Sequence, residues 1–254
     1  MGEDLEEALN DSAFWHFRYQ QQAAWTRETR RYLFSQTGVQ NHDHLLDVGC
    51  GSGAMLDALS AEGFTNLTGI DLHLQILSNM QRRYAAACAD GSGLPFANGQ
   101  FDHTLCHFTL LWAEKPQRLI CEMRRVTRRG GWVFALAEPD YGGRMSYPDA
   151  LERIAEKQTE ALAMQGANTH MGRELMGLLA ACGLENVTGG IIGSETREGA
   201  FNALSGDLRV LQRDLAGSLE PGVIDQALAE AEKAAALPGA MWYVPVCFAC
   251  GQVV

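Results

Sequence analysis

An acid followed by a cluster of glycines is the feature of this chain most able to do chemistry. Residues 45–56 read LLDVGCGSGAML, which places Asp47 just before Gly49, Gly51 and Gly53. Glycines after a buried strand permit positive φ and let a ligand approach the backbone, and the helix that follows turns its N–H groups toward the same point. A carboxylate there repels a pyrophosphate but suits an ammonium or sulfonium group. The pattern therefore predicts a site for a ligand with a positive centre.

Two further acids follow the next two predicted strands. Asp71 ends the strand that reads GID, where a carboxylate can accept both hydroxyls of a ribose. Asp90 begins the loop DGSGLPF, where an acid can receive the exocyclic amine of adenine. Each also has a structural alternative, because Asp71 is suited to cap a helix and Asp90 to cap a turn before Gly91. The three acids together favour a nucleoside ligand.

The glycine cluster alone does not choose the cofactor. G-x-G-x-x-A fits Gly49, Gly51 and Ala54, so a nicotinamide dinucleotide fingerprint is formally satisfied. Asp71 serves the ribose of either cofactor, whereas Asp47 disfavours the dinucleotide. No G-x-x-x-x-G-K-[ST] motif is present, which excludes a P-loop, and no Tyr-x-x-x-Lys pair of the short-chain dehydrogenase type occurs.

Alternating elements must position these residues. Apolar runs predict five strands and the intervening patterns predict helices, an arrangement typical of βαβ units and a parallel sheet. The expected strands are His44–Val48, Asn66–Ile70, Tyr84–Ala89, Phe101–Cys106 and Trp132–Ala137, and the expected helices are 53–62, 73–82 and 115–127, after an N-terminal helix over 12–35.

The regular alternation of predicted strands and helices ends after residue 140. Helices are predicted over 148–164 and 172–182, a strand over Glu185–Gly193, and helices over 201–236 with a break at Glu220-Pro221-Gly222. The closing segment MWYVPVCFACGQVV predicts a last strand or a pair of short ones. No linker rich in Pro, Gly or Ser marks a boundary, so residues 1–254 are interpreted as one domain with a helical insertion.

Composition narrows the class of protein. The formal net charge of −11 disfavours nucleic acid as a partner, and no apolar run approaches a membrane span. The N-terminus is acidic, unlike a signal or transit peptide. Seven scattered cysteines favour reduced thiols and a cytoplasmic location. Cys247 and Cys250 form a lone C-x-x-C and are interpreted as core residues, so no metal site is predicted.

The ordered run LLDVGCGSG, GIDL, ADGSGLPF, FDHTLCHFTLLW and MRRVTRRGGWVFALAEPD resembles the class I S-adenosylmethionine-dependent methyltransferases, including small-molecule and quinone-biosynthesis types. The resemblance implies an α/β, Rossmann-like, doubly wound and mostly parallel seven-stranded sheet with its last strand antiparallel. It implies S-adenosylmethionine as the cofactor. The residues that it assigns to the cofactor are Asp47, Gly49, Cys50 and Gly51 for the methionine part, Asp71 for the ribose, Leu72, Asp90 and Gly91 for the adenine, and His107 beneath the methionine part.

The expected function is methyl transfer to a small organic acceptor by in-line displacement. The alternatives are a cofactor-binding module without methyl transfer and a nicotinamide-dependent oxidoreductase. The resemblance divides the chain into an N-terminal helical cap (1–41), a cofactor-binding core (42–140) and a substrate side (141–254) whose helical cover spans 201–236.

Catalytic residues are not determined by the sequence. His107 and Glu138 are the candidate bases, because each is predicted near a strand end that faces the site. Tyr141 is a candidate for packing on the acceptor, although EPDYGGR also fits a plain exit loop. On the N-terminal helix, Tyr19 and Gln22 are candidates for closing over the carboxylate of the cofactor, or else lie on a half-buried face. The sequence specifies neither the acceptor nor the oligomeric state.

Overall fold

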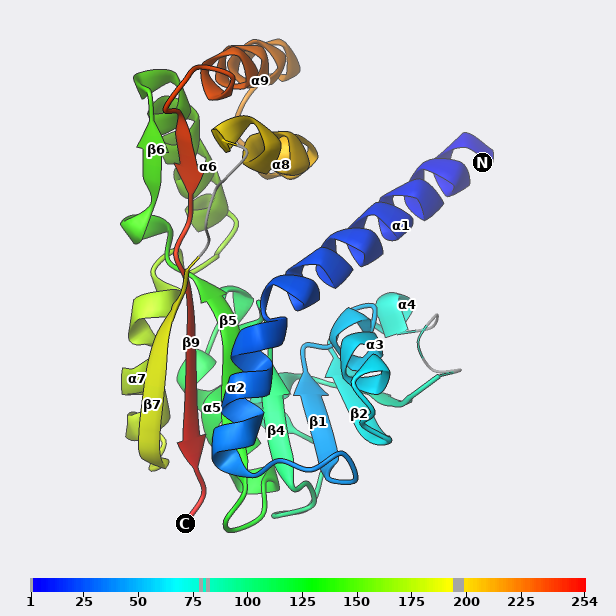
Figure 1. The fold of residues 1–254 in the computed structure, drawn as a ribbon. Coiled ribbons are helices and arrows are strands. Elements are labelled where there is room, and N and C mark those ends of the chain that lie inside the picture. The colour runs from blue at the N-terminus through cyan, green and yellow to red at the C-terminus, as the bar shows by residue number, and fades with distance from the viewer. Residues whose placement is uncertain (1, 78–79, 81–82, 194–198) are drawn as a thin grey trace.

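A computed structural model describes residues 2–77, 80, 83–193 and 199–254 (Figure 1). The main sheet contains β1 His44–Val48, β2 Asn66–Asp71, β3 Ala85–Cys88, β4 His103–Cys106, β5 Trp132–Pro139, β7 Glu185–Ile192 and β9 Val246–Gln252. A small sheet pairs β6 Met145–Tyr147 with β8 Met241–Tyr243. The α-helices are α1 Gly2–Trp25, α2 Arg27–Thr37, α3 Ala54–Ala61, α4 Leu74–Leu77, α5 Pro116–Val126, α6 Asp149–Met164, α7 Met171–Ala181, α8 Gly199–Leu215 and α9 Pro221–Ala235, and the 3₁₀ turns are η1 Gly91–Gly93, η2 Leu110–Trp112 and η3 Tyr141–Gly143.

The main sheet has the order β3-β2-β1-β4-β5-β9-β7. Strands β1 to β5 pair in parallel, whereas β9 is antiparallel to both β5 and β7. The strand order reverses between β1 and β4, and in open α/β sheets ligands bind at that point, beyond the carboxyl ends of the strands. The predicted seven-stranded Rossmann-like sheet with an antiparallel last strand is confirmed.

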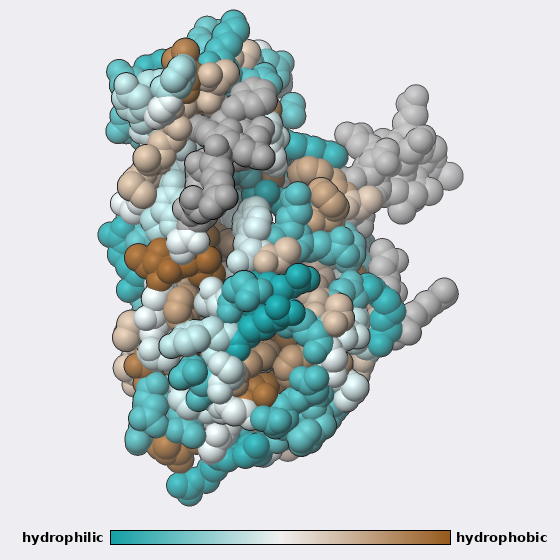
Figure 2. All heavy atoms as spheres, in the orientation of Figure 1, coloured by the Kyte–Doolittle hydropathy of each residue, from teal (hydrophilic) through white to brown (hydrophobic). Residues whose placement is uncertain are grey.

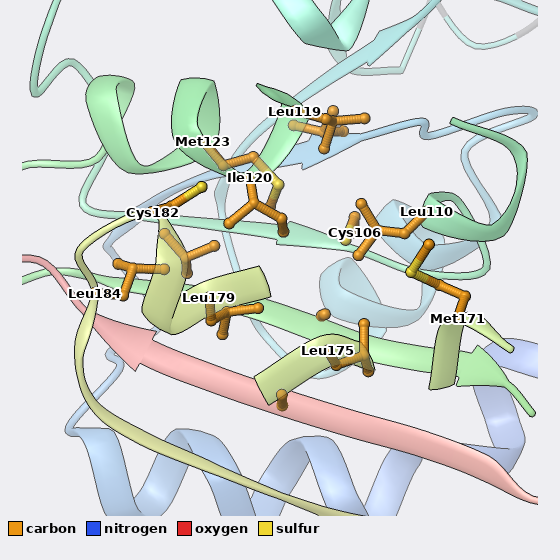
Figure 3. Close-up of a cluster of buried hydrophobic side chains, with 14 of the residues drawn as sticks. Cys106, Leu110, Leu119, Ile120, Met123, Met171, Leu175, Leu179, Cys182 and Leu184 are labelled. Carbon is orange, nitrogen blue, oxygen red and sulfur yellow. The ribbon is translucent and has the colours of Figure 1, made fainter. Parts of the chain in front are cut away.

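Both faces of the sheet are covered, and the strand sequences show why. Side chains alternate between faces along a strand. In β5, Val133 and Ala135 join the cluster beneath α5 and α7 (Figure 3), and Phe134 and Leu136 join the cluster beneath α2 and α3. All four are fully buried. A fully buried Val, Leu or Phe side chain contributes about 1.5–3 kcal/mol, so these two apolar layers hold the strand ends that carry the site.

The segment after β5 builds a small outer module beyond the carboxyl ends of the sheet. Helices α6, α8 and α9 pack together with β6 and β8, and they bury a separate apolar cluster around Leu151, Leu211 and Trp242. Figure 1 shows this module stacked above the sheet, with β7 and β9 reaching up to it. The sequence predicted a helical insertion but not the β6–β8 sheet. Figure 2 shows a largely hydrophilic surface on this face, with a hydrophobic patch near the upper end of β7.

Several predicted elements need correction. The N-terminal helix is two helices, because the chain breaks at Thr26 between α1 and α2. The break in the helical cover lies at residues 216–220, and Pro221 begins α9, where its missing N–H leaves no helical bond unmade. The predicted helix 73–82 is α4 over its first part, whereas residues 78–79 and 81–82 lie outside the described residues.

The cysteines also differ from expectation. Cys121 of α5 and Cys182 after α7 form a disulfide, and the other five cysteines are free thiols. The prediction of reduced thiols throughout was wrong for this pair, because the packing of α5 against α7 brings together residues 61 positions apart. Cys247 and Cys250 are buried on opposite faces of β9, as predicted for core residues. Over the described ranges no helix is both long and apolar enough to span a bilayer.

Candidate cofactor and acceptor site

A large cavity lies between the carboxyl ends of the strands and the outer module. Its volume is about 1750 Å³, more than the roughly 300–1,000 Å³ of a usual small-molecule pocket. The loops after β1, β2, β3 and β4 line one half, η3, α6, α8 and β8 line the other, and α1 runs along both. The volume is large enough for two small molecules, and we call the half beside the strand-end loops the cofactor half and the other the acceptor half.

The glycine loop is shaped by its own backbone and by its neighbours. The N–H groups of Gly49 and Cys50 both donate to the Ile70 carbonyl, at 2.8 and 3.0 Å, which ties the loop to β2. Gly49 has φ +76°, and a Cβ atom there would clash with the Thr109 side chain. Gly51 has φ +50° and faces the ring of Tyr19. Positions 49 and 51 therefore favour glycine, which keeps the loop on this course beside the cavity.

Gly49→Ala is expected to distort the loop. The left-handed backbone costs an L-residue about 1–2 kcal/mol, before the clash with Thr109 is counted. We expect about tenfold weaker binding of S-adenosylhomocysteine, measured by calorimetry. Gly177→Ala is the matched control, because a Cβ atom at Gly177 meets nothing within 4 Å. Adding Thr109→Ala to Gly49→Ala removes the two closest clashing atoms and is expected to recover part of the affinity. Full affinity in the single variant would contradict this account of the loop.

Asp47 is the least satisfied polar group of the site. Its side chain is 1% exposed, and within the described part of the chain neither carboxylate oxygen has a hydrogen-bond partner. Burial, together with the nearby charge of Asp71, raises the pKa of Asp47 to about 8. A buried carboxylate without partners is costly. Because Asp47 lines the cavity, a ligand with a positive group would supply what the protein does not.

Asp71 holds the glycine loop from the tip of β2. Its Oδ2 accepts from the Gly51 N–H at 2.9 Å, and its Oδ1 accepts from the His73 N–H at 2.9 Å. The side chain is 13% exposed and lines the cavity, with exposed Leu72 beside it. Two carboxylate oxygens offer about four acceptor sites. The proposed ribose contact and the observed loop contact are therefore compatible.

Asp71→Ala should weaken the binding of S-adenosylhomocysteine by about 1–3 kcal/mol, because ribose hydroxyls and the loop amide both lose an acceptor. Calorimetric titration measures the loss. Asp225→Ala removes an exposed carboxylate on α9 and should leave the affinity unchanged. An unaltered dissociation constant in the Asp71 variant would remove Asp71 from the site.

Asp90 and Gly91, after β3, line the same half of the cavity as Asp47 and Asp71. Asp90 is exposed, and its Oδ1 accepts from the Ser92 N–H at 2.8 Å, which caps η1. This hydrogen bond also lowers the pKa of Asp90, so the group is a carboxylate at neutral pH. Gly91 lies against Val48 and Leu119, leaving no room for a side chain without displacement. Both residues line the cavity, so capping and ligand binding are compatible here too.

Helix α1 crosses the mouth of the glycine loop. His16 Nδ1 lies 2.8 Å from the Ser52 hydroxyl, and a Cβ atom at Gly51 would lie 3.8 Å from the Tyr19 ring. Tyr19 and Gln22 both line the cavity. The structure therefore brings the two predicted residues of the cap to the predicted place, over the loop that follows β1.

His107 lies in the cavity wall but is engaged by the N-terminal helices. Its Nε2 is 3.3 Å from the Thr26 hydroxyl, and Thr26 in turn accepts from the buried Arg30. Burial, followed by the charge of Arg30, lowers the pKa of His107 to about 3, although a hydrogen bond to the Gln22 backbone opposes the shift. A neutral imidazole with so low a pKa is a weak proton acceptor. The structure favours a positioning role for His107 over that of a base.

Glu138 does not reach the cavity. It is fully buried, and its Oε1 accepts from the N–H groups of Thr109 and Leu110 at 2.8 and 2.7 Å, while Oε2 accepts from Leu111 at 3.1 Å. The carboxylate thus accepts hydrogen bonds from the backbone N–H groups at the start of η2, which would otherwise lack partners. This arrangement argues against the predicted role of Glu138 as a base.

The acceptor half contains residues that sequence reasoning missed. Tyr141, which was predicted, lines it, and burial raises the pKa of its hydroxyl to about 12. Around it lie Arg144, three residues further along the same EPDYGGR segment, and side chains from three distant elements, namely Arg18 of α1, Asp207 and Asp214 of α8 and Trp242 of β8. Because the residues other than Arg144 meet only through the packing of α1 and the outer module, no local motif could have marked them.

The cofactor half fits an adenosyl sulfonium. It offers a glycine-rich turn beside the cavity, an acid at a strand tip for ribose hydroxyls, and a buried acid lacking a positive partner among the described residues. A pyrophosphate would meet three acidic side chains there, from Asp47, Asp71 and Asp90. The fold and this site are those expected of the class I, S-adenosylmethionine-dependent methyltransferases that the sequence resembles.

Comparison with known proteins identifies the same class. Residues 46–135 match a family model described as a methyltransferase domain, and this segment belongs to the class I methyltransferases, whose cofactor is S-adenosylmethionine. The predicted family is confirmed.

Curated relatives match over part of their length. An uncharacterised protein of Mycobacterium tuberculosis is 35% identical over 111 residues, 41% of this chain and 40% of that protein. A malonyl-[acyl-carrier protein] O-methyltransferase of Erwinia pyrifoliae is 31% identical over 46% of this chain and 45% of its own. A demethylmenaquinone methyltransferase of Renibacterium salmoninarum is 30% identical over 50% and 56%. The similarity thus spans about half or less of each relative.

Solved structures share the fold at low identity. A possible histamine N-methyltransferase from Thermotoga maritima has a TM-score of 0.58 at 13% identity, with both chains fully covered. The [4+2]-cyclase SpnF has a TM-score of 0.58 at 21% identity, covering 89% of this chain and 80% of its own. Because a cyclase also has this fold, the fold alone does not specify methyl transfer.

Proposed function

We propose that this protein is a methyltransferase that transfers a methyl group from S-adenosylmethionine to a small organic acceptor. The observation that carries the proposal is Asp47, a buried acid without a partner among the described residues, next to a turn in which a side chain at Gly49 would clash with Thr109. The positive methionine end of S-adenosylmethionine supplies the missing counter-charge. Among the described side chains on this side of the cavity, Asp47 alone has that need.

The remaining assignments follow the strand ends. We assign Asp47 and the backbone of Gly49, Cys50 and Gly51 to the methionine part, and Asp71 to the ribose. Leu72, Asp90 and Gly91 are assigned to the adenine. Tyr19 and Gln22 of α1 cover the cofactor, and His107 holds α1 and α2 against β4 through Thr26.

The cofactor supplies a methyl group on a sulfonium, which departs with a neutral leaving group. The protein therefore has no oxyanion to stabilise, and its main tasks are to align the nucleophile with the methyl group and to exclude water. Helix α1 and the outer module close the cavity from two sides. The engagement of His107 and Glu138 in structural contacts supports transfer by alignment, without either residue as a base.

The roles of the chain segments are also part of the proposal. Residues 42–140 bind the cofactor, and residues 141–254 together with the N-terminal helices enclose the acceptor within one functional unit. A net charge of −11 supports a small molecule over a nucleic acid as the acceptor. A cytoplasmic location stays a prediction, which five free thiols support and the Cys121–Cys182 disulfide opposes.

Two measurements test the proposed function. Calorimetry with S-adenosylhomocysteine and NADH, side by side, decides the cofactor, and we expect only the former to bind. Transfer of labelled methyl groups from S-adenosylmethionine to a panel of small metabolites then separates a methyltransferase from a binding module or a cyclase-like protein. Binding of the cofactor without label transfer to any acceptor would favour the module, and binding of NADH alone would refute both.

A further inference from the structure

Arg144 occupies an unusual place in the acceptor half of the cavity. It follows η3 and directly precedes β6, whose pairing with β8 aligns Ser146 with Trp242. Its guanidinium carbon lies 4.5 Å from the centre of the Trp242 ring and 5.3 Å from that of Tyr141. Its Nη1 donates to the Ala155 carbonyl at 2.9 Å, and its Nη2 to the Gln158 Oε1 at 2.5 Å. These contacts hold the group in one orientation.

The charge of Arg144 has no direct counter-ion in the described structure. Both of its hydrogen-bond acceptors are neutral, and none of the described carboxylates forms an ion pair with it. Its Nε is buried and, among the described residues, unpartnered. Burial lowers the pKa of Arg144 to about 10, so the group remains a cation at neutral pH. A half-buried cation whose hydrogen-bond acceptors are both neutral is less favourable than one that a ligand supplies with a counter-charge.

The nearby acids are already engaged. Asp207 accepts from Arg18 through Oδ1 and from the Trp242 indole N–H at 3.2 Å through Oδ2. Asp214 accepts from the Gln158 amide at 2.7 Å, and burial raises its pKa. Gln158 thus bridges Arg144 and Asp214 without joining them directly. Neither acid is placed to neutralise Arg144 by contact.

The cavity therefore has two electrostatic halves. The loops of the strand ends contribute four acidic side chains, from Asp47, Asp71, Asp90 and Glu114, and one lysine, Lys115, which pairs with Glu114, so this half suits a cation. The acceptor half contains two carboxylates but three guanidinium groups, from Arg18, Arg144 and Arg213. An acceptor with an anionic end would be attracted to the second half and repelled from the first, which would turn its other end toward the cofactor.

We propose that the acceptor carries an anionic group, a carboxylate in its simplest form, which Arg144 binds beside the rings of Tyr141 and Trp242. This inference rests on the proposed function and adds the chemical class of the acceptor. Two aromatic rings beside the cation also favour a planar or apolar body next to the anion. Each Nη of Arg144 keeps one N–H beyond the one it donates within the protein, and guanidinium N–H groups suit the oxygens of a carboxylate.

Two probes of nearly the same shape, one an anionic carboxylate and the other its neutral amide, test this proposal. The affinity of 4-hydroxybenzoate and of 4-hydroxybenzamide is measured by saturation-transfer NMR on the protein saturated with S-adenosylhomocysteine. We expect the carboxylate to bind at least about tenfold more tightly than the amide, since a charged hydrogen-bonded pair is the difference. Equal affinity, or no measurable binding of the carboxylate, would overturn the assignment.

Two arginine variants test which residue causes the preference for the carboxylate over the amide. Arg144→Gln is expected to abolish the preference for the carboxylate while leaving the affinity for S-adenosylhomocysteine unchanged. Arg153→Gln, an exposed arginine of the same module on α6, should retain the preference. The comparison within the unmodified protein stands even if Arg144→Gln folds poorly. Failure of the unmodified protein to bind S-adenosylhomocysteine would refute the proposed function, whereas intact cofactor binding without a carboxylate preference would refute only this inference.

Discussion

Glu138→Ala is expected to destabilise the protein by about 3 kcal/mol, the largest loss of stability that we predict for a single substitution, because three buried backbone donors lose one acceptor group. The N–H groups of Thr109, Leu110 and Leu111 all point at this carboxylate, and the residue is fully buried. Urea unfolding monitored by circular dichroism measures the difference.

Two controls separate this effect from a general sensitivity to lost acids. Glu138→Gln keeps an acceptor oxygen of the same reach and should retain part of the stability that alanine loses. Glu156→Ala removes an exposed carboxylate on α6 and should change stability by less than about 0.5 kcal/mol. If Glu138→Ala unfolds like the unmodified protein but has lost methyl transfer, Glu138 acts in the chemistry and the structural role is wrong.

Asp47→Asn is expected to move stability and cofactor affinity in opposite directions. The folded protein holds the pKa of Asp47 at about 8, above the ordinary 3.8, so it binds more protons than the unfolded chain between these values. Stability is therefore lost as the pH rises through this window. The variant lacks the ionisable group and should be more stable than the unmodified protein at pH 9, by about 2 kcal/mol or more, with little difference at pH 4.

The same substitution removes the counter-charge for the methionine end of the cofactor. We expect the affinity for S-adenosylhomocysteine at pH 8 to fall by about 2 kcal/mol, roughly 30-fold. If Asp47 were an ordinary core acid, its replacement by asparagine would lower stability and would cause no specific loss of affinity for S-adenosylhomocysteine. Asp43→Asn provides that contrast, because Asp43 is also buried but accepts from the Gln40 N–H at 2.7 Å.

The cofactor half was predictable because its signals are local. Each signal lies within a few consecutive residues: Asp47 with its glycines, the acid at the end of β2, and the turn at Asp90. Parallel strands then bring them to one edge of the sheet. Every residue that the resemblance assigned to the cofactor lines the cavity. The assignment of each residue to a part of the cofactor stays a prediction until cofactor binding is measured.

The other half was not predictable, because its partners are distant in sequence. Asp207 and Arg18 come from α8 and α1, and they meet only in the folded chain. Glu138 stands at a strand end, as a base would, yet its three partners belong to the turn after β4. Residue type and position alone could not separate these roles. The disulfide between Cys121 and Cys182 depends on helix packing in the same way.

The central claim is that the protein without cofactor holds Asp47 mostly protonated and that a cofactor with a positive group ionises it. Calorimetric binding of S-adenosylhomocysteine at pH 7, in buffers of different ionisation enthalpy, gives the number of protons released. We predict a release of close to one proton by the unmodified protein and close to none by Asp47→Asn. Binding without proton release, or an equal release by both proteins, would contradict the claim.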